Sequence, residues 1–118
     1  MPTRSSSSVR IFWPAFDKAG LVETLREGVR RLEHELPLLR VVLFGSQATG
    51  RATAASDVDL LIVYRGEPRS DAYALVRRAF RVARLEPHLY TEAQCRQAAD
   101  VVERMTRDGI TVFPRDPS

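Results

Sequence analysis

The chain has 118 residues, which is the size of a single domain. Its 44% hydrophobic and 28% charged residues are ordinary for a globular protein and exclude collagen-like, coiled-coil and wholly disordered chains. The formal net charge of +3 is too small to identify a class of ligand. Cys95 is the single cysteine, which excludes a disulfide framework and a cysteine-based zinc site. We therefore expect a cytoplasmic protein without a membrane span or a signal peptide.

The N-terminal region has two parts. Residues 1–10 are polar and aperiodic, and we expect them to form a flexible arm before a single domain over residues 11–118. A helix is predicted from an N-cap at Asp17 to about Pro37. Five apolar residues at spacings of three and four form its buried face: Leu21, Leu25, Val29, Leu32 and Leu36.

Two short apolar runs in the middle of the chain predict strands. Residues 40–44 end at Gly45, and residues 58–64 end at a turn over 65–68. The connection over 45–57 is too short for a standard crossover with a full helix, but it has room for one helical turn. We therefore expect the two strands to pair in an antiparallel or irregular manner.

A second long helix is predicted after these strands, with Ser70 or Asp71 as its N-cap. Its buried face consists of six residues at helical spacing: Ala72, Leu75, Val76, Ala79, Phe80 and Ala83. The opposite side carries Arg77, Arg81 and Arg84. We interpret this arginine stripe as a solvated face in preference to a nucleic-acid surface.

The C-terminal third predicts a strand, a helix and a closing strand. Residues 85–90 form a strand at the sheet edge or only partly paired, because Pro87 has no N–H to donate. Residues 91–94 match a capping box that opens a helix ending at Gly109. The predicted inner face of this helix is Ala98, Val101, Val102 and Met105. With a last strand over 110–113, the fold class is α/β (α+β), with a small, mixed, largely antiparallel sheet and flanking helices.

The sequence around Gly45 and Ser46 has the character of a phosphate-binding turn. Both residues follow a strand directly and open a predicted helical turn, where backbone N–H groups lack intrahelical partners. Glycine allows close approach of an anion, and the serine hydroxyl adds an uncharged donor. The bland alternative is an ordinary strand-to-helix turn.

Asp57 and Asp59 stand at i and i+2 at the start of the second strand, so they project from one face. Two carboxylates this close repel unless a cation offsets their charge. Mg²⁺ suits them, because it takes few protein carboxylates and completes its shell with water and phosphate oxygens. Glu86 is the candidate third acid of a two-metal site. His88 shares its face but is left out of the predicted catalytic set.

The segment GSQATGRATAASDVDLLIV, over residues 45–63, resembles the signature of the DNA polymerase beta-like nucleotidyltransferase superfamily. The short chain looks like the minimal (MNT-type) nucleotidyltransferases that accompany helical HEPN proteins. The resemblance implies a nucleotidyltransferase fold, a phosphate-binding pair at Gly45 and Ser46, and metal-binding, catalytic acids at Asp57, Asp59 and Glu86. Arg51 is a candidate for phosphate contacts, replacing arginines that family members often carry at the positions of Gln47 and Thr49.

The implied activity is transfer of a nucleoside monophosphate, typically AMP from ATP, to a hydroxyl, with Mg²⁺ as the cofactor in one or two copies and Mn²⁺ as a substitute. The implied acceptor is a tyrosine of a HEPN-type toxin, so the protein would be an enzymatic antitoxin of the protein adenylyltransferase kind. The larger members' helical domain is missing, so a partner or a second copy of the chain would close the site.

Two alternatives remain at this level. The first is a non-catalytic module that binds nucleotide or masks a toxin by contact. The second is nucleotidyl transfer to RNA or to a small molecule. A small-molecule acceptor would need an acidic binding subdomain, for which the chain has no room. RNA would have to be held by the arginine stripe, with salt-sensitive affinity, and we do not expect nucleic acid as a partner.

Overall fold

The computed structural model describes residues 18–52 and 56–114. The predicted N-terminal arm and the N-cap at Asp17 lie outside this part of the chain. In chain order the elements are α1 (Lys18–Leu32), β1 (Leu38–Phe44), α2 (Ser46–Thr49), β2 (Val58–Tyr64), α3 (Ala72–Ala79), β3 (Leu85–Thr91), α4 (Glu92–Gln97), α5 (Ala99–Thr106) and β4 (Ile110–Phe113).

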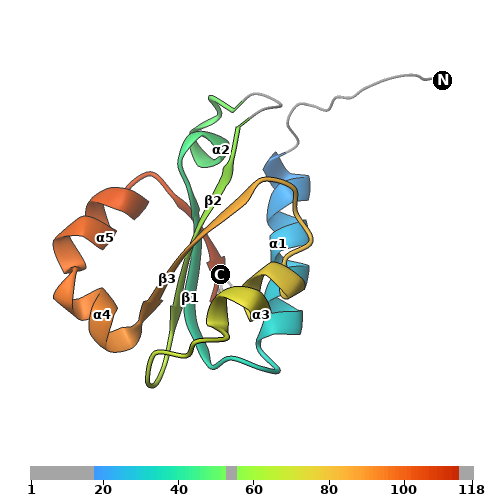
Figure 1. Ribbon diagram of the computed structural model, residues 1–118. Helices are drawn as coiled ribbons and strands as arrows, with labels where there is room; N and C mark the ends of the chain where they lie inside the picture. Colours follow the sequence, from blue (N-terminus) through green and yellow to red (C-terminus); the bar gives the residue numbers. More distant parts are fainter. Residues whose placement is uncertain (1–17, 53–55, 115–118) are drawn as a thin grey trace.

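The four strands form one mixed sheet in the order β3-β2-β1-β4 (Figure 1). β1 pairs antiparallel with β2 and with β4, whereas β2 and β3 run parallel and are connected through α3. Parallel neighbours need a crossover, and the segment between β2 and β3 is long enough to supply one. The predicted fold class is therefore confirmed, including the antiparallel pairing of the first two strands and the edge position of the strand that contains Pro87.

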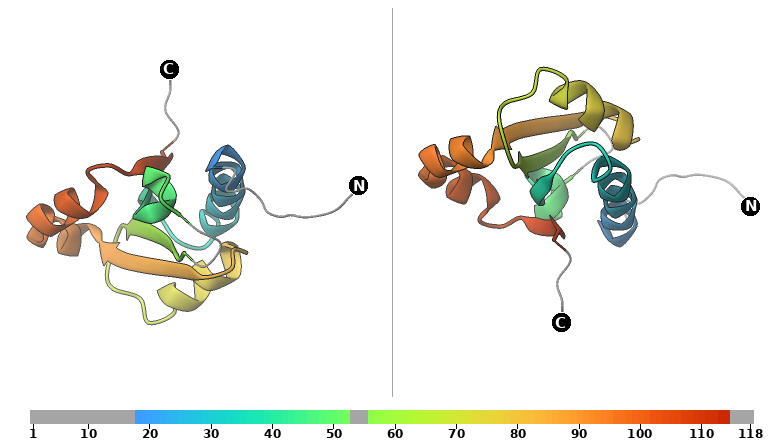
Figure 2. Two further views of the ribbon diagram at one scale, coloured as in Figure 1. Left: turned by 90° about the horizontal axis from the view of Figure 1, so that it is seen from above. Right: turned by 90° about the horizontal axis from the view of Figure 1, so that it is seen from below.

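The first face of the sheet carries the main hydrophobic core. Helices α1 and α3 cover this face, as the end-on views show (Figure 2). Phe80 is the largest fully buried side chain, and it lies against Gly28 of α1, where an added Cβ would collide with its ring. The glycine thus permits close approach of α1 to the end of α3. This larger cluster continues along the inward positions of the strands, such as Val41, Leu60 and Ile62.

Helices α4 and α5 cover the opposite face of the sheet with a thinner layer (Figures 1 and 2). Its fully packed residues are Val42, Leu61, Val63 and Val102. Thr91 caps α4 with the predicted capping box, in which its side chain and that of Gln94 each accept a hydrogen bond from the other's backbone N–H. This face is the one that also bears the acidic residues of interest.

Several predicted boundaries are wrong. The first helix ends at Leu32 and not near Pro37, and in the turn that follows the backbone N–H groups of Glu35 and Leu36 both donate to the Leu32 carbonyl. Leu36 is nevertheless buried in the turn that follows. The strand predicted from residue 40 begins at Leu38, and the one predicted to end at residue 90 includes Thr91.

The predicted arginine stripe does not exist as a helix face. α3 ends at Ala79, and Phe80 leaves it in an extended conformation to bury its ring. Arg81 and Arg84 therefore lie in the connection to β3, where the chain reverses toward its pairing with β2. Asp71 precedes α3 without a side-chain capping bond. The nucleic-acid alternative loses the regular surface on which it depended.

The predicted single C-terminal helix is two helices. The helix is interrupted at Ala98, between α4 and α5. The second helix ends before Arg107, so Gly109 is not its C-cap. Val102 is buried as predicted, but Val101 is 45% exposed. The apolar face of α5 is narrow, and only residues one helical turn apart reach the sheet.

Candidate functional site

The predicted acidic pair lies at the start of β2, on the face covered by α4 and α5. Asp59 pairs across the sheet with Phe44, the last residue of β1, and shares its face with Leu61 further along β2. Asp57 precedes the strand and is half exposed, whereas the Asp59 side chain is 28% exposed. The pair therefore stands at the open end of the thinner face.

Gly45 brings the predicted phosphate turn directly against Asp59. Its φ of 79° with ψ of −159° belongs to a region that is essentially restricted to glycine. A Cβ at this position would collide with the Asp59 carboxylate oxygen Oδ2. The absence of a side chain thus creates the close approach between the turn and the acid. As predicted, one helical turn follows, the four-residue helix α2.

The other two predicted phosphate ligands, Ser46 and Arg51, lie at opposite ends of helix α2. Ser46 opens α2 beside Gly45, as the sequence suggested. Arg51 lies just beyond α2, where its backbone N–H donates to the Ser46 carbonyl and its side chain is exposed. Lys18 donates from Nζ to the Ala48 carbonyl at 3.1 Å and so joins the start of α1 to α2. The turn is therefore held between the first strand and the first helix.

A cation already lies beside Asp57. Arg84 Nη2 stands 3.4 Å from Asp57 Oδ1, with both side chains about half exposed. Arg84 has a φ of 60°, a conformation that costs a residue with a Cβ roughly 1–2 kcal/mol. Its carbonyl accepts the backbone N–H of Val58, which aligns β3 with β2. The turn before β3 therefore places the positively charged Arg84 side chain beside Asp57.

Glu86 lies on the same rung of the sheet as Asp59, in the parallel pairing of β2 with β3. The side chains of a parallel pair in register share one face, so the sequence-based placement of Glu86 beside the pair agrees with the register. Its side chain is exposed, however, and no three Asp, Glu, His or Cys side chains within residues 18–52 and 56–114 gather closely enough to hold a metal. The role of Glu86 as a third ligand stays a prediction.

His88 is the residue that the sequence-based catalytic set omitted. Its Nε2 lies 3.6 Å from Asp59 Oδ1, and its ring packs on Phe44 at 5.0 Å between centroids. This nitrogen is shielded from solvent and has no hydrogen-bond partner. The i, i+2 relation to Glu86 was the signal that could have included it, because both residues share a strand face.

The acidic pair and the glycine turn fit a hard divalent cation. Mg²⁺ binds through one or two carboxylates and takes its other ligands from water and phosphate oxygens, so two aspartates suffice. Asp59 is fixed against a backbone concavity that a Cβ would fill, and an unpartnered buried nitrogen lies beside its other oxygen. Asp57 and Asp59 would hold the metal.

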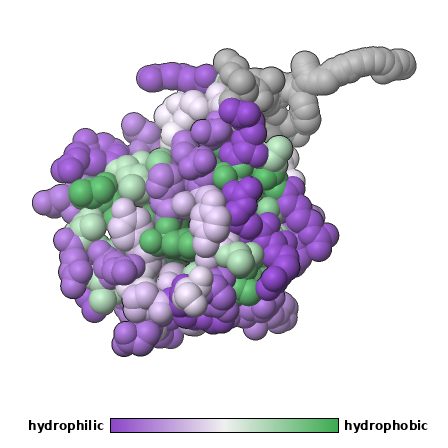
Figure 3. Space-filling model, viewed as in Figure 1, coloured by the Kyte–Doolittle hydropathy of each residue, from purple (hydrophilic) through white to green (hydrophobic). Residues whose placement is uncertain are grey.

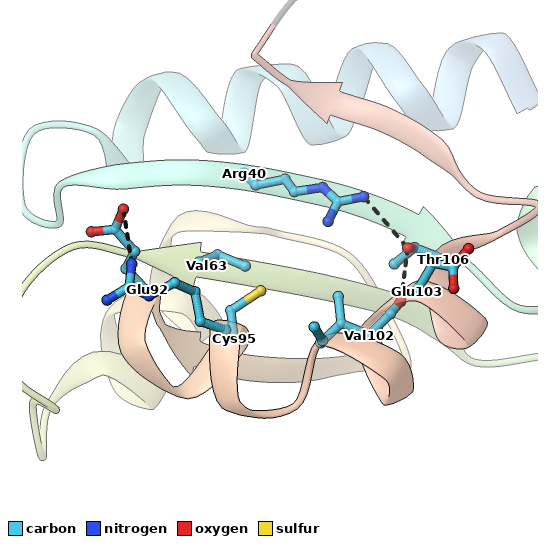
Figure 4. Close-up of a pocket in the computed structure, with 9 residues that line it drawn as sticks. Arg40, Val63, Glu92, Cys95, Val102, Glu103 and Thr106 are labelled. Carbon is cyan, nitrogen blue, oxygen red and sulfur yellow. Dashed lines mark hydrogen bonds and ion pairs between the residues drawn. The ribbon is translucent and has the colours of Figure 1, made fainter.

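A cavity of about 390 Å³ lies on the same face of the sheet, but at its far end (Figure 4). Arg40, Val63 and Cys95 line it, and Arg40 donates weakly to Thr106 at 3.4 Å. Arg40 stands four residues from Phe44 along β1, which corresponds to roughly 13 Å of strand. The cavity is therefore separate from the acidic pair.

A second charged pair lies away from the acidic residues of β2. The Arg69 guanidinium hydrogen-bonds Asp71 and lowers the pKa of that carboxyl, but this exposed pair lies beyond the opposite end of β2. On the face shown in Figure 3, small hydrophobic patches alternate with hydrophilic residues. No helix within the described ranges is long and apolar enough to cross a membrane.

Comparisons with known proteins agree with this geometry. The chain resembles a crystal structure from Sulfolobus solfataricus, solved at 1.40 Å and provisionally described as a nucleotidyltransferase, with a TM-score of 0.57 and 21% identity over 80% of each chain. That likeness shows a common fold. No curated protein sequence matches the chain. The sequence pattern of the nucleotidyltransferase domain family matches residues 22–110, which include every predicted site residue, and the chain belongs to this family.

Proposed function

We propose that the protein is a metal-dependent nucleotidyltransferase that moves a nucleoside monophosphate, AMP from ATP in the first instance, to a hydroxyl. The observation that carries the proposal is the close approach of Gly45 to the Asp59 carboxylate, because it would bring bound phosphate next to a metal-binding acid. A phosphate bound at the turn would lie next to the acids that hold its counterion. One or two Mg²⁺ ions would serve, with Mn²⁺ as a substitute.

The reaction joins the acceptor oxygen to the α-phosphorus and breaks the bond between that phosphorus and the oxygen bridging to the β-phosphate, releasing pyrophosphate. The backbone N–H groups and hydroxyl at Gly45 and Ser46 bind the phosphates. Asp57 and Asp59 would hold the metal, which when bound would neutralise the triphosphate and make the hydroxyl more acidic. A carboxylate of the pair accepts the hydroxyl proton. Arg51 and Glu86 are secondary candidates for phosphate and metal contacts.

The acceptor we propose is a tyrosine hydroxyl of a helical HEPN-type toxin, which makes this protein a cytoplasmic antitoxin of the adenylyltransferase kind. The acids stand at an open end of the sheet, with Asp57 half exposed. An open site suits a macromolecular acceptor, because the partner itself excludes water when it docks. A second copy of the chain could cover the same opening.

The first experiment measures thermal unfolding of the wild type and of Asp57→Asn/Asp59→Asn with each of the four nucleoside triphosphates, with and without Mg²⁺. A ligand present at a hundred times its dissociation constant adds about 2.7 kcal/mol of stability. We expect a Mg²⁺-dependent rise in Tm with one nucleotide, lost in the double variant. Intact mass of a co-expressed HEPN partner would then show the added nucleotide, and an unchanged mass would contradict transfer.

The exposure of Glu86 favours a second candidate, a non-catalytic module that binds nucleotide or masks the toxin by contact. The two candidates differ in one measurement. Asp57→Asn/Asp59→Asn abolishes toxin neutralisation if transfer is responsible, whereas neutralisation survives if contact alone is sufficient.

A further inference from the structure

The two carboxylate oxygens of Asp59 have different neighbours. Oδ2 faces the Gly45 turn, where no side chain intervenes. Oδ1 faces His88, with 3.6 Å to Nε2. The carboxylate thus lies between the site of phosphate approach and an imidazole on the neighbouring strand. Of the two neighbours, Gly45 and His88, only His88 has a side chain that can donate a hydrogen bond to the carboxylate.

The His88 side chain is 37% exposed, but its Nε2 is shielded from solvent. Phe44 packs on the ring at an interplanar angle of 60°, and Nε2 has no solvent contact and no hydrogen-bond partner. A buried polar atom without a partner costs free energy, and a hydrogen bond from Nε2–H to the nearest acceptor would remove this cost. Asp59 Oδ1 is the acceptor that the ion-pair geometry identifies. The separation of 3.6 Å is longer than a hydrogen bond, and a small rotation of the carboxylate would close the gap.

We propose that His88 is a positioning residue for the metal-binding carboxylate: Nε2–H donates to Asp59 Oδ1 and orients Oδ2 toward the phosphate turn. The inference rests on the proposed function, since it identifies His88 as the residue that orients Asp59 toward the bound metal. It differs from a role in packing, which would need the ring's shape but not its donor. It also differs from direct metal ligation, which would use the nitrogen lone pair and not the N–H.

The test varies the donor and keeps the bulk. His88→Leu retains an apolar contact with Phe44 and removes the donor, whereas His88→Gln keeps an amide donor at a similar reach. His34→Leu is the matched control, because that histidine is exposed beyond α1 and lines only the groove between α1 and α3. The readout is the Mg²⁺ concentration that gives half of the nucleotide-dependent rise in Tm.

We expect His88→Leu to raise that Mg²⁺ concentration about ten-fold, because a hydrogen bond to a charged group is lost. His88→Gln should restore most of the difference, and His34→Leu should match the wild type. A wild-type response in His88→Leu would overturn the proposal. So would a Gln variant that folds but behaves like the Leu variant, because donation would then be irrelevant.

A second measurement does not depend on nucleotide binding. Thermal unfolding without ligand or metal compares the wild type, His88→Leu, Asp59→Ala and the double variant. If the two side chains interact, the Tm changes of the single variants do not add up in the double variant. Additive changes would overturn the contact itself. Absence of any Mg²⁺-dependent nucleotide effect in the wild type, alongside non-additive changes, would instead reject the proposed function and keep the contact.

Discussion

The two faces of the sheet divide stability and chemistry between them. The face under α1 and α3 holds the larger core, with Phe80 packed against Gly28 and fully buried aliphatic residues along three strands. The face under α4 and α5 holds a small cluster, and its open end carries Asp59 and His88. The same strands serve both faces, because successive side chains alternate between them.

This difference explains how a chain of 118 residues keeps charged groups at a site without losing its fold. The acids need solvent and ligand access, which excludes dense packing around them. The dense packing is therefore concentrated on the other face, only one sheet thickness away. The strands carry both faces, so that Asp59 is placed by a scaffold whose main core lies on the opposite side of the sheet.

The largest loss of stability is expected for Phe80→Ala, on the densely packed face under α1 and α3. Losing a buried aromatic ring costs about 3–5 kcal/mol, because a cavity is added to the lost burial. Chemical denaturation of the variant measures the loss. Tyr73→Ala in helix α3, which precedes Phe80, is the control, since Tyr73 is 52% exposed. Below its Tm the Phe80 variant should keep a wild-type Mg²⁺ requirement. A changed requirement would show that the two faces are coupled.

Gly45→Ala tests the site face through its backbone. The variant must pay about 1–3 kcal/mol for a conformation suited only to glycine, and its Cβ displaces the Asp59 carboxylate. Gly50→Ala is the matched control, because Gly50 has a φ of 81° but an added Cβ there would meet open space. Both variants should unfold at lower temperature, and only Gly45→Ala should lose nucleotide affinity. Equal losses of affinity would mean that the turn, not its contact with Asp59, is responsible.

Arg84→Gly is expected to give the smallest effect. Glycine removes both the left-handed strain and the cation beside Asp57, whereas Arg84→Ala removes the cation alone. The glycine variant should therefore be more stable than the alanine variant by about 1 kcal/mol. Both should bind Mg²⁺ about two- to five-fold more tightly, because an exposed ion pair competes only weakly with the metal. Weaker Mg²⁺ binding would assign Arg84 a supporting role in the site.

Local patterns were sufficient for most elements. The run over residues 58–64 predicted β2 to the residue, and the capping box at Thr91 fixed the start of α4. Prediction failed where long-range packing decided the conformation. Phe80 continues the helical periodicity of α3, yet it leaves the helix because its ring is buried beside Gly28. Ala98 carries no local breaker, yet its φ of −109° and ψ of 31° interrupt the helix at a residue that packs against the smaller apolar cluster.

The candidate site shows the same division. Asp57, Asp59, Gly45 and Ser46 follow from the sequence alone, because strand alternation and turn chemistry act over a few residues. The parallel register that sets Glu86 beside Asp59, and the approach of His88 to the same carboxylate, depend on which strands are neighbours. Strand order is decided by the burial of whole faces, which no short segment encodes. The sequence therefore determined the chemical groups of this protein, and the tertiary structure decided which of them meet.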